Sequence, residues 1–361
     1  MADIFGVRIT PDDGGKQIIL DASMRYASYL GGATMTANGS AVGGFKSQPA
    51  GSRPLIVPRD LFRLSAQANP AGPSIAFVKS MSFAGNTLNY TAGWKSPETN
   101  TAPATPAGFA DVFSVAYAAN PAAQYGVRFM NGANFMEISD VSYAGYVTFR
   151  GIIDINGSWG IPQGIVNMGN YVVFARWSNT DVPLFLDRAN NTINTYNGFG
   201  STAGSVLGGL VSGIQIVIVS CGISPALPAS GYGMVIRNAA NQVVYSSRYP
   251  PVMWTDAYYD FPYYEDFGDP TGDSVRWINP TGNVALPMIP LCSLGVQRGD
   301  YTRSNNGYRF RPVLYAGFKM SGNSVSTSRA KSAGVEGAVY MQPRAIQAAC
   351  QLPCIDASYY F

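Results

Sequence analysis

The side chain best suited to proton transfer near neutral pH is missing from this sequence, which contains no histidine. Ser-His-Asp triads, Cys-His pairs and zinc sites built on histidine are therefore excluded. No glycine-rich phosphate loop follows a strand and opens a helix, and we recognise no residue set for a cofactor or a metal.

Paired carboxylates are the remaining route to catalysis, because glycosidases hold two of them across a cleft. The sequence has only four glutamates, Glu98, Glu137, Glu265 and Glu336, and none has a recognisable partner. The aspartates lie mostly in turns, where hydrogen bonds to the local backbone explain them. We therefore expect no catalytic residue and no enzyme.

The aromatic–acidic segment, residues 256–269, is the most unusual stretch of the chain. It holds six aromatic and five acidic side chains in fourteen residues. Aromatic rings give rigid contact area at low entropic cost, which suits a subunit interface or contact with a host receptor. The acids could instead hold Ca²⁺, although their spacing matches no loop that we recognise. The candidate contact residues are Tyr258, Tyr259, Phe261, Tyr263, Tyr264 and Phe267.

The last three residues, Tyr359, Tyr360 and Phe361, are candidates for the same role. They are apolar for a free tail, so we expect them to dock onto this subunit or a neighbouring one. Just before them, the residues from Arg344 to Cys350 could form a short helix.

Four cysteines are too few for a disulfide scaffold in a chain of this length. Cys350 and Cys354 are separated by three residues, and half a zinc site here would need both Cys221 and Cys292. Reduced cysteines without a function are the favoured interpretation, ahead of a disulfide between Cys350 and Cys354.

A basic cluster precedes the C-terminal region. It could face acidic polysaccharide or lipid phosphates, but a solvated strand face paired with the aromatic–acidic segment is the favoured interpretation. Its members are Arg303, Arg309, Arg311, Lys319, Arg329 and Lys331.

Composition indicates an all-β protein. Of 361 residues, 47% are apolar and only 12% are charged, and 40 glycines and 24 prolines without a period predict many turns. A net charge of only +3, with no dense patch of Lys and Arg, argues against nucleic-acid binding. The N-terminus does not resemble a signal peptide, so we expect synthesis and folding in a cytoplasm.

An uncharged stretch between Arg188 and Arg237 requires a test for a membrane span. Residues 206–223 are mostly apolar, but the part at 214–219 is β-branched apart from Gln215. This pattern predicts a buried strand and not a spanning helix.

A threefold internal repeat organises the sequence. Each copy reads as a strand, a short turn rich in Asn, Asp or Gly, and a second strand, which predicts a β-hairpin. Gly6, Gly126 and Gly233 mark the copies, 120 and 107 residues apart, and could permit an unusual backbone angle or close packing. The paired strands are 6–9 with 17–23, 125–130 with 135–142, and 232–237 with 242–249.

The hairpin pattern resembles one found in minor tail and tail-fibre proteins of siphophages, which are tailed bacteriophages. The similarity covers the three hairpins and is best from the N-terminus to Gly31, whereas the chain after residue 255 resembles nothing that we recognise. The resemblance implies a virion component of the tail-tip region, and it transfers no catalytic residue.

The repeat spacing predicts three β domains at 1–120, 121–227 and 228–361, with 222–231 as the best linker. Short strands and frequent turns predict tandem β-sandwiches or small barrels. The expected protein is a homo-oligomer, with a trimer favoured, in a phage tail tip, baseplate or fibre. Its partners would be other tail proteins and a host glycan or protein receptor. A capsid or head-decoration protein and a polysaccharide-degrading tailspike are the alternatives.

Overall fold

The computed structural model describes residues 6–64, 74–95, 106–119, 121, 123, 126–131, 134–139, 145–200, 204–229, 233–266, 276–299, 302–303, 309–337 and 345–361. Strands make up 65% of the structure and helices 3%, which confirms the all-β prediction. The described part contains no helix long and apolar enough to cross a membrane.

The three predicted hairpins are all present, and each is a separate two-stranded antiparallel sheet that opens one segment of the chain. The first segment contains β1 (Gly6–Ile9), β2 (Ile18–Asp21), β3 (Arg25–Thr36), β4 (Ala41–Val42), β5 (Ser52–Asp60), β6 (Phe62–Leu64), β7 (Ile75–Ala84), β8 (Thr87–Lys95) and β9 (Pro106–Ala116). The second contains β10 (Gly126–Asn131), β11 (Asn134–Ser139), β12 (Gly145–Asn156), β13 (Ser158–Gly160), α1 (Gln163–Asn167), β14 (Tyr171–Arg176), β15 (Asn179–Asp187), β16 (Thr192–Gly200), β17 (Gly204–Leu207) and β18 (Leu210–Cys221). The third contains β19 (Val235–Arg237), β20 (Val243–Ser246), β21 (Met253–Trp254), β22 (Ala257–Phe261), β23 (Tyr264–Asp266), β24 (Pro287–Pro290), β25 (Gly295–Arg298), β26 (Thr302–Arg303), β27 (Arg309–Ser321), β28 (Ser324–Gly337), β29 (Ala345–Gln347), β30 (Cys350–Asp356) and the 3-10 turn η1 (Ala357–Tyr359).

The repeat extends far beyond the hairpins. In every segment the last long strand lies between two earlier ones, giving the antiparallel orders β3-β9-β5, β12-β18-β14 and β22-β30-β24. Each segment also sends out a second hairpin before its last strand returns: β7 with β8, β15 with β16, and β27 with β28. The chain is therefore built from three copies of one topology.

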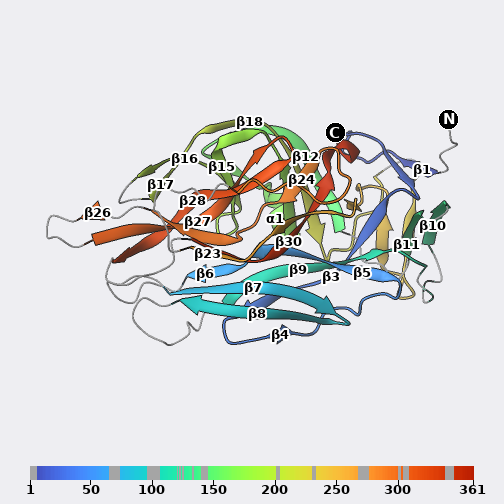
Figure 1. Ribbon diagram of the computed structural model, residues 1–361. Helices are drawn as coiled ribbons and strands as arrows, with labels where there is room; N and C mark the ends of the chain where they lie inside the picture. Colours follow the sequence, from blue (N-terminus) through green and yellow to red (C-terminus); the bar gives the residue numbers. More distant parts are fainter. Residues whose placement is uncertain are drawn as a thin grey trace.

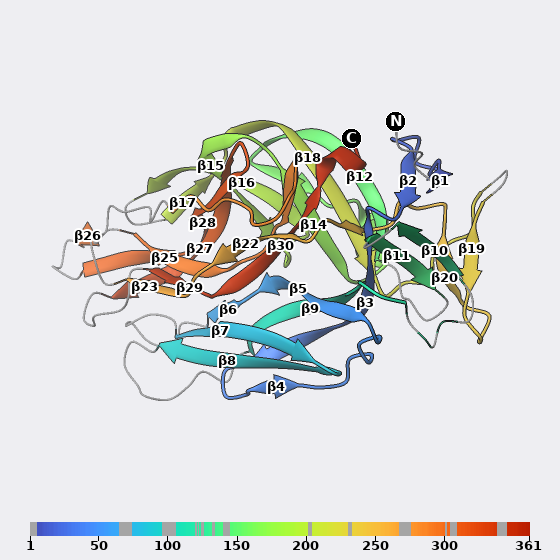
Figure 2. The same cartoon turned by 45° about the vertical axis from the view of Figure 1, so that its right-hand side comes forward.

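The hairpins β1–β2, β10–β11 and β19–β20 gather at the same end of the elongated molecule (Figures 1 and 2). Their second strands each bury apolar side chains in one shared core, which contains Leu20, Ile138 and Val244. The opening glycines are needed there for the predicted reasons. A Cβ at Gly6 would lie 2.6 Å from the backbone oxygen of Leu20, and Gly126 has a φ of +154°.

Alternation along the long strands explains the two cores of the protein. In β18, Ile214, Ile216 and Ile218 face the core beneath the second hairpins, β7–β8, β15–β16 and β27–β28, whereas Val217 and Val219 face the core shared with the opening hairpins. A strand covered on both faces needs a continuous apolar run. This confirms the prediction of a buried strand in the uncharged stretch.

The segments are fused and do not form separate bodies. The second and third segments join in one six-stranded sheet, β12-β18-β14-β24-β30-β22, and β21 of the third segment pairs with β3 of the first. The described part of the expected linker also contacts the first segment, because Ala229 N–H donates a hydrogen bond to the Asp12 carboxylate at 3.0 Å. The sheets thus continue across the predicted boundary at 227.

The C-terminal aromatic tail docks onto its own chain, which confirms one of the two predicted outcomes. Tyr360 is buried in the shared core, accepts a hydrogen bond from Met253 N–H at 2.9 Å and donates to Pro251 O at 3.2 Å. Lys16 Nζ donates to the carbonyls of Ser358 at 2.5 Å and Phe361 at 3.0 Å, so the first hairpin closes over the tail. The expected helix before this region is wrong, because Ala345–Gln347 pairs in a sheet as β29.

Candidate functional site

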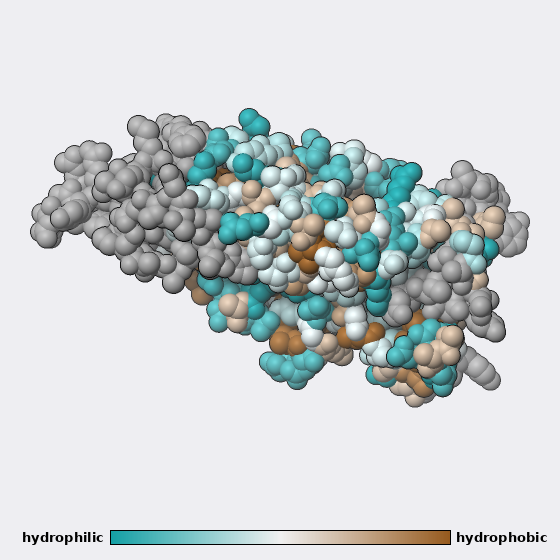
Figure 3. Space-filling view, turned by 90° about the horizontal axis from the view of Figure 1, so that it is seen from below, coloured by the Kyte–Doolittle hydropathy of each residue, from teal (hydrophilic) through white to brown (hydrophobic). Residues whose placement is uncertain are grey.

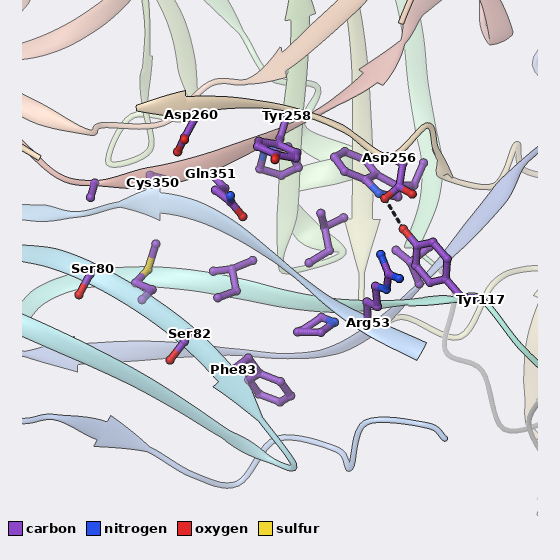
Figure 4. A pocket seen from close by; sticks show the side chains of 18 residues that line it. Arg53, Ser80, Ser82, Phe83, Tyr117, Asp256, Tyr258, Asp260, Cys350 and Gln351 are labelled. Atoms are coloured by element: carbon purple, nitrogen blue, oxygen red, sulfur yellow. Dashed lines mark hydrogen bonds between the residues drawn. The ribbon is translucent and has the colours of Figure 1, made fainter. Parts of the chain in front are cut away.

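A groove of about 480 Å³ opens between the first and third segments (Figure 4). One side comes from β5, β7 and the end of β9, and the other comes from β21, β22 and β30. Its volume falls within the range of about 300–1,000 Å³ that is typical of small-ligand sites.

A sheet edge and a sheet face create this groove. Strand β5 ends the order β21-β3-β9-β5, and across from it lies the face of β22 and β30 that carries Tyr258, Asp260 and Gln351. Pro54 and Pro58 have no backbone N–H, so another strand cannot form a regular ladder of hydrogen bonds along this edge of β5. The gap between the two sheets is therefore lined by side chains.

Alternation along β22 decides which aromatic–acidic residues reach the groove. Tyr258 and Asp260 point toward it (Figure 4), whereas Tyr259 and Phe261, on the opposite face, are 0% and 1% exposed. The two buried rings belong to the core, where Phe261 packs edge-on against Phe318 at 6.0 Å between centroids. The structure thus corrects the prediction that Tyr259 and Phe261 make interface or receptor contacts, because both are core residues.

A polar contact between Tyr117 and Asp256 closes one end of the groove (Figure 4). The Tyr117 hydroxyl donates to Asp256 Oδ1, and the Arg53 guanidinium lies 4.3 Å from the centroid of the Tyr117 ring. Burial, and after it the hydrogen bond to Asp256, raises the pKa of Tyr117 to about 12, so the hydroxyl remains a donor at neutral pH. Asp256 adopts a φ of +63°, an uncommon backbone angle for a residue with a side chain.

The floor and the far side of the groove combine apolar and polar groups. Trp254 and Phe83 are buried beneath it, and Ser80, Ser82 and Gln351 present polar groups at its surface. Cys350 also lines the groove, but burial raises the pKa of its thiol to about 12, so the thiolate needed for nucleophilic attack is scarce at neutral pH.

The remaining sequence candidates lie away from the groove. Tyr263 is exposed, stacks on Phe77 at 6.3 Å between centroids and donates to Glu265 at 2.9 Å, while Tyr264 lies near Arg276. Phe267 lies outside the described residues. At the C-terminus Tyr360 is core, and Tyr359 and Phe361 are half-buried against it.

Neither metal hypothesis finds a site in the described residues. No three acidic or cysteine side chains there come together as a cation site would need, and all four cysteines are free and buried. Cys350 and Cys354 lie on one strand, where residues four apart are separated by roughly 13 Å, too far for a disulfide.

Two ion pairs differ from the expected pairing of the basic cluster with the aromatic–acidic segment, one made by a member of each. Lys331 pairs with Asp187 of the second segment at 2.7 Å. Glu265 of the acidic segment pairs with Lys95 of the first segment, also at 2.7 Å.

A family model matches residues 6–337, which include all three opening hairpins. The chain belongs to DUF6453, a family of unknown function. No curated protein and no solved structure matches it. The DUF6453 match extends through β28, so it covers the first two copies of the topology, the first-segment side of the groove and strand β22, and it ends before β30 of the third copy.

Proposed function

We propose that this DUF6453 chain is a structural component of a tailed-phage virion, located in the tail tip, baseplate or fibre, where it contributes to assembly and host attachment. The observation that carries the proposal is the set of three hairpins at one end of the molecule. The same hairpins carry the sequence resemblance to siphophage tail proteins. In this proposal the chain is made in the host cytoplasm and then joins other tail proteins in the virion.

Binding, and not catalysis, is the proposed mode of action. The chain has no histidine, and its groove offers aromatic rings, hydroxyls, an amide and two carboxylates on a rigid frame of strands. Asp256 and Asp260 flank Tyr258 in Figure 4, and the Asp256 carboxylate accepts a hydrogen bond from the Tyr117 hydroxyl at one end of the groove.

The repeat bears on the expected homotrimer. Three copies of one topology pack around a shared core, so a single chain already buries surfaces that separate smaller subunits would bury against one another. The face seen in Figure 3 carries small, separate hydrophobic patches among hydrophilic atoms, and such patches are usual on a monomer. We therefore propose that one copy acts at each position in the tail.

Immunogold electron microscopy tests the location. Antibodies raised against the purified chain should place gold at the tail tip of intact particles, and the same antibodies should reduce adsorption to host cells. Gold on the head would overturn the proposal in favour of the capsid or head-decoration alternative. Release of oligosaccharide from host polysaccharide by the purified chain would favour the tailspike alternative.

A further inference from the structure

We infer that the groove between the first and third segments binds a neutral oligosaccharide, through stacking on Tyr258 and hydrogen bonds to Asp260, Gln351 and the serines of β7. This inference rests on the proposed role in host attachment and adds the chemical class of the ligand.

The aromatic component lies at the centre of the groove. Tyr258 is half-buried and points into it from β22, with Trp254 buried in the floor nearby. The C–H face of a sugar ring is apolar, and a tyrosine ring held by its strand offers a flat apolar partner at little entropic cost.

The polar component suits hydroxyl groups, which both donate and accept hydrogen bonds. Asp260 supplies carboxylate oxygens that accept, Gln351 supplies an amide that does both, and Ser80 and Ser82 supply hydroxyls. Within the described part of the chain these side chains are available to a ligand, since Asp260, Gln351, Ser80 and Ser82 all lie at the exposed surface. A few convergent polar groups over an apolar floor are what a small-ligand site requires.

Charge selects a neutral sugar. The groove contains the carboxylates of Asp256 and Asp260 against the one guanidinium of Arg53, and that guanidinium lies over the Tyr117 ring. Uronic or sialic acids would bring further carboxylates close to Asp260 and be repelled.

A peptide strand is the less suitable occupant. An extended peptide binds an exposed sheet edge through a row of backbone hydrogen bonds. Pro54 and Pro58 remove donors from β5, the edge strand that borders the groove. Side-chain contacts must therefore dominate recognition.

The test uses the full purified chain and ligand-observed NMR with calorimetry. The neutral probes are trisaccharides of glucose, galactose, mannose and N-acetylglucosamine, and the acidic probes are trigalacturonate and trimeric sialic acid. At least one neutral probe should bind more tightly than both acidic probes. Binding of acidic probes alone, or of none of the six, would overturn the inference.

Variants assign binding to the groove. Tyr258→Ala should weaken binding of the best neutral probe at least about tenfold, and Asp260→Asn, which preserves shape, about three- to tenfold. Tyr263→Ala is the matched control, because Tyr263 is an exposed tyrosine of the same segment outside the groove, and its effect should stay below about twofold. Unchanged affinity in Asp260→Asn together with Tyr258→Ala would contradict the site. Gold at the tail tip with no saccharide binding would refute this inference alone and leave the proposed function standing.

Discussion

Arg59 and Asp111 form a bidentate ion pair at the place where the three segments meet. Arg59 Nη2 donates to Asp111 Oδ1 at 2.6 Å while its Nε donates to Oδ2. Tyr29 adds a hydrogen bond to the same carboxylate at 3.0 Å, and Asn170 of the second segment donates to Tyr29 at 3.3 Å. The backbone carbonyl of Arg59 accepts from Ser293 N–H of the third segment at 3.3 Å. One residue thus links all three copies of the repeat.

Asp111→Asn should therefore be strongly destabilising. Asp111 is fully buried and Arg59 is 11% exposed, so removing the negative charge leaves a buried guanidinium uncompensated. Such losses cost about 3–5 kcal/mol. Urea unfolding followed by far-ultraviolet circular dichroism would measure the change in the free energy of unfolding. Arg63→Gln serves as a control, because its pair with Asp60 is more exposed and should contribute less than about 1 kcal/mol. Equal effects of the two variants would contradict the proposed importance of the junction.

The ion pair between Asp13 and Arg150 should make stability depend on pH. Burial alone would raise the pKa of Asp13, but hydrogen bonds from Arg150 and from Gly15 N–H hold it below the usual value of 3.8. A carboxylate whose pKa is lower in the folded state stabilises the fold above its ordinary pKa, and this contribution is lost as the pH falls through the folded pKa. Because the Asp13 side chain is 36% exposed, we expect no more than about 1 kcal/mol.

Unfolding midpoints of the wild type and Asp13→Asn should accordingly differ at pH 7 and converge below the folded pKa of Asp13. The double variant D13N/R150Q, compared with R150Q, should lose most of this difference at every pH. A gap between wild type and Asp13→Asn that persists at the acidic limit would show that the pair is not its source.

Local sequence signals predicted the repeated parts of the fold, and they failed where distant strands meet. The hairpins and β18 have their patterns within a few consecutive residues, so strand and turn preferences sufficed. The groove depends on Tyr117 and Asp256, which are 139 residues apart, and on the position of β5 opposite the face of β22 and β30, which no local pattern encodes. The repeated three-strand order is likewise set by contacts between distant parts of the chain.

The composition of the aromatic–acidic segment does not distinguish its rings, but the alternation of a strand does. Alternation separates Tyr258 and Asp260 from Tyr259 and Phe261 in the sequence itself. Only the first pair lines the groove.

The hydrogen bonds of Tyr360 should be needed for the docking of the C-terminus. Tyr360→Phe leaves the buried Met253 N–H without its acceptor and should cost about 1–3 kcal/mol, whereas Tyr360→Ala also leaves a cavity and should cost about 3–5 kcal/mol. Tyr359→Phe is the matched control at a half-buried ring and should change stability by less than about 0.5 kcal/mol. Thermal and urea unfolding would rank the three variants, and equal stability of Tyr360→Phe and Tyr359→Phe would refute the prediction.

The proposal of a single-copy protein predicts a monomer in solution. Light scattering after size-exclusion chromatography should give a mass near the 38.5 kDa of one chain. Dilution should leave this value unchanged, because the three segments already share their cores within the chain. A mass three times larger that persists on dilution would support the homotrimer expected from the sequence.

None of the four thiols should react with an aqueous thiol reagent until the protein unfolds. Cys221, Cys292, Cys350 and Cys354 are buried, and burial raises the pKa of each thiol, that of Cys350 to about 12. The thiolate is the reactive form, so both access and ionisation oppose modification. Titration with a chromogenic disulfide should give no rapid reaction in buffer and four equivalents in denaturant without reductant. Two equivalents in denaturant would reveal a disulfide, and rapid reaction in buffer would mean that the groove floor at Cys350 opens to solvent.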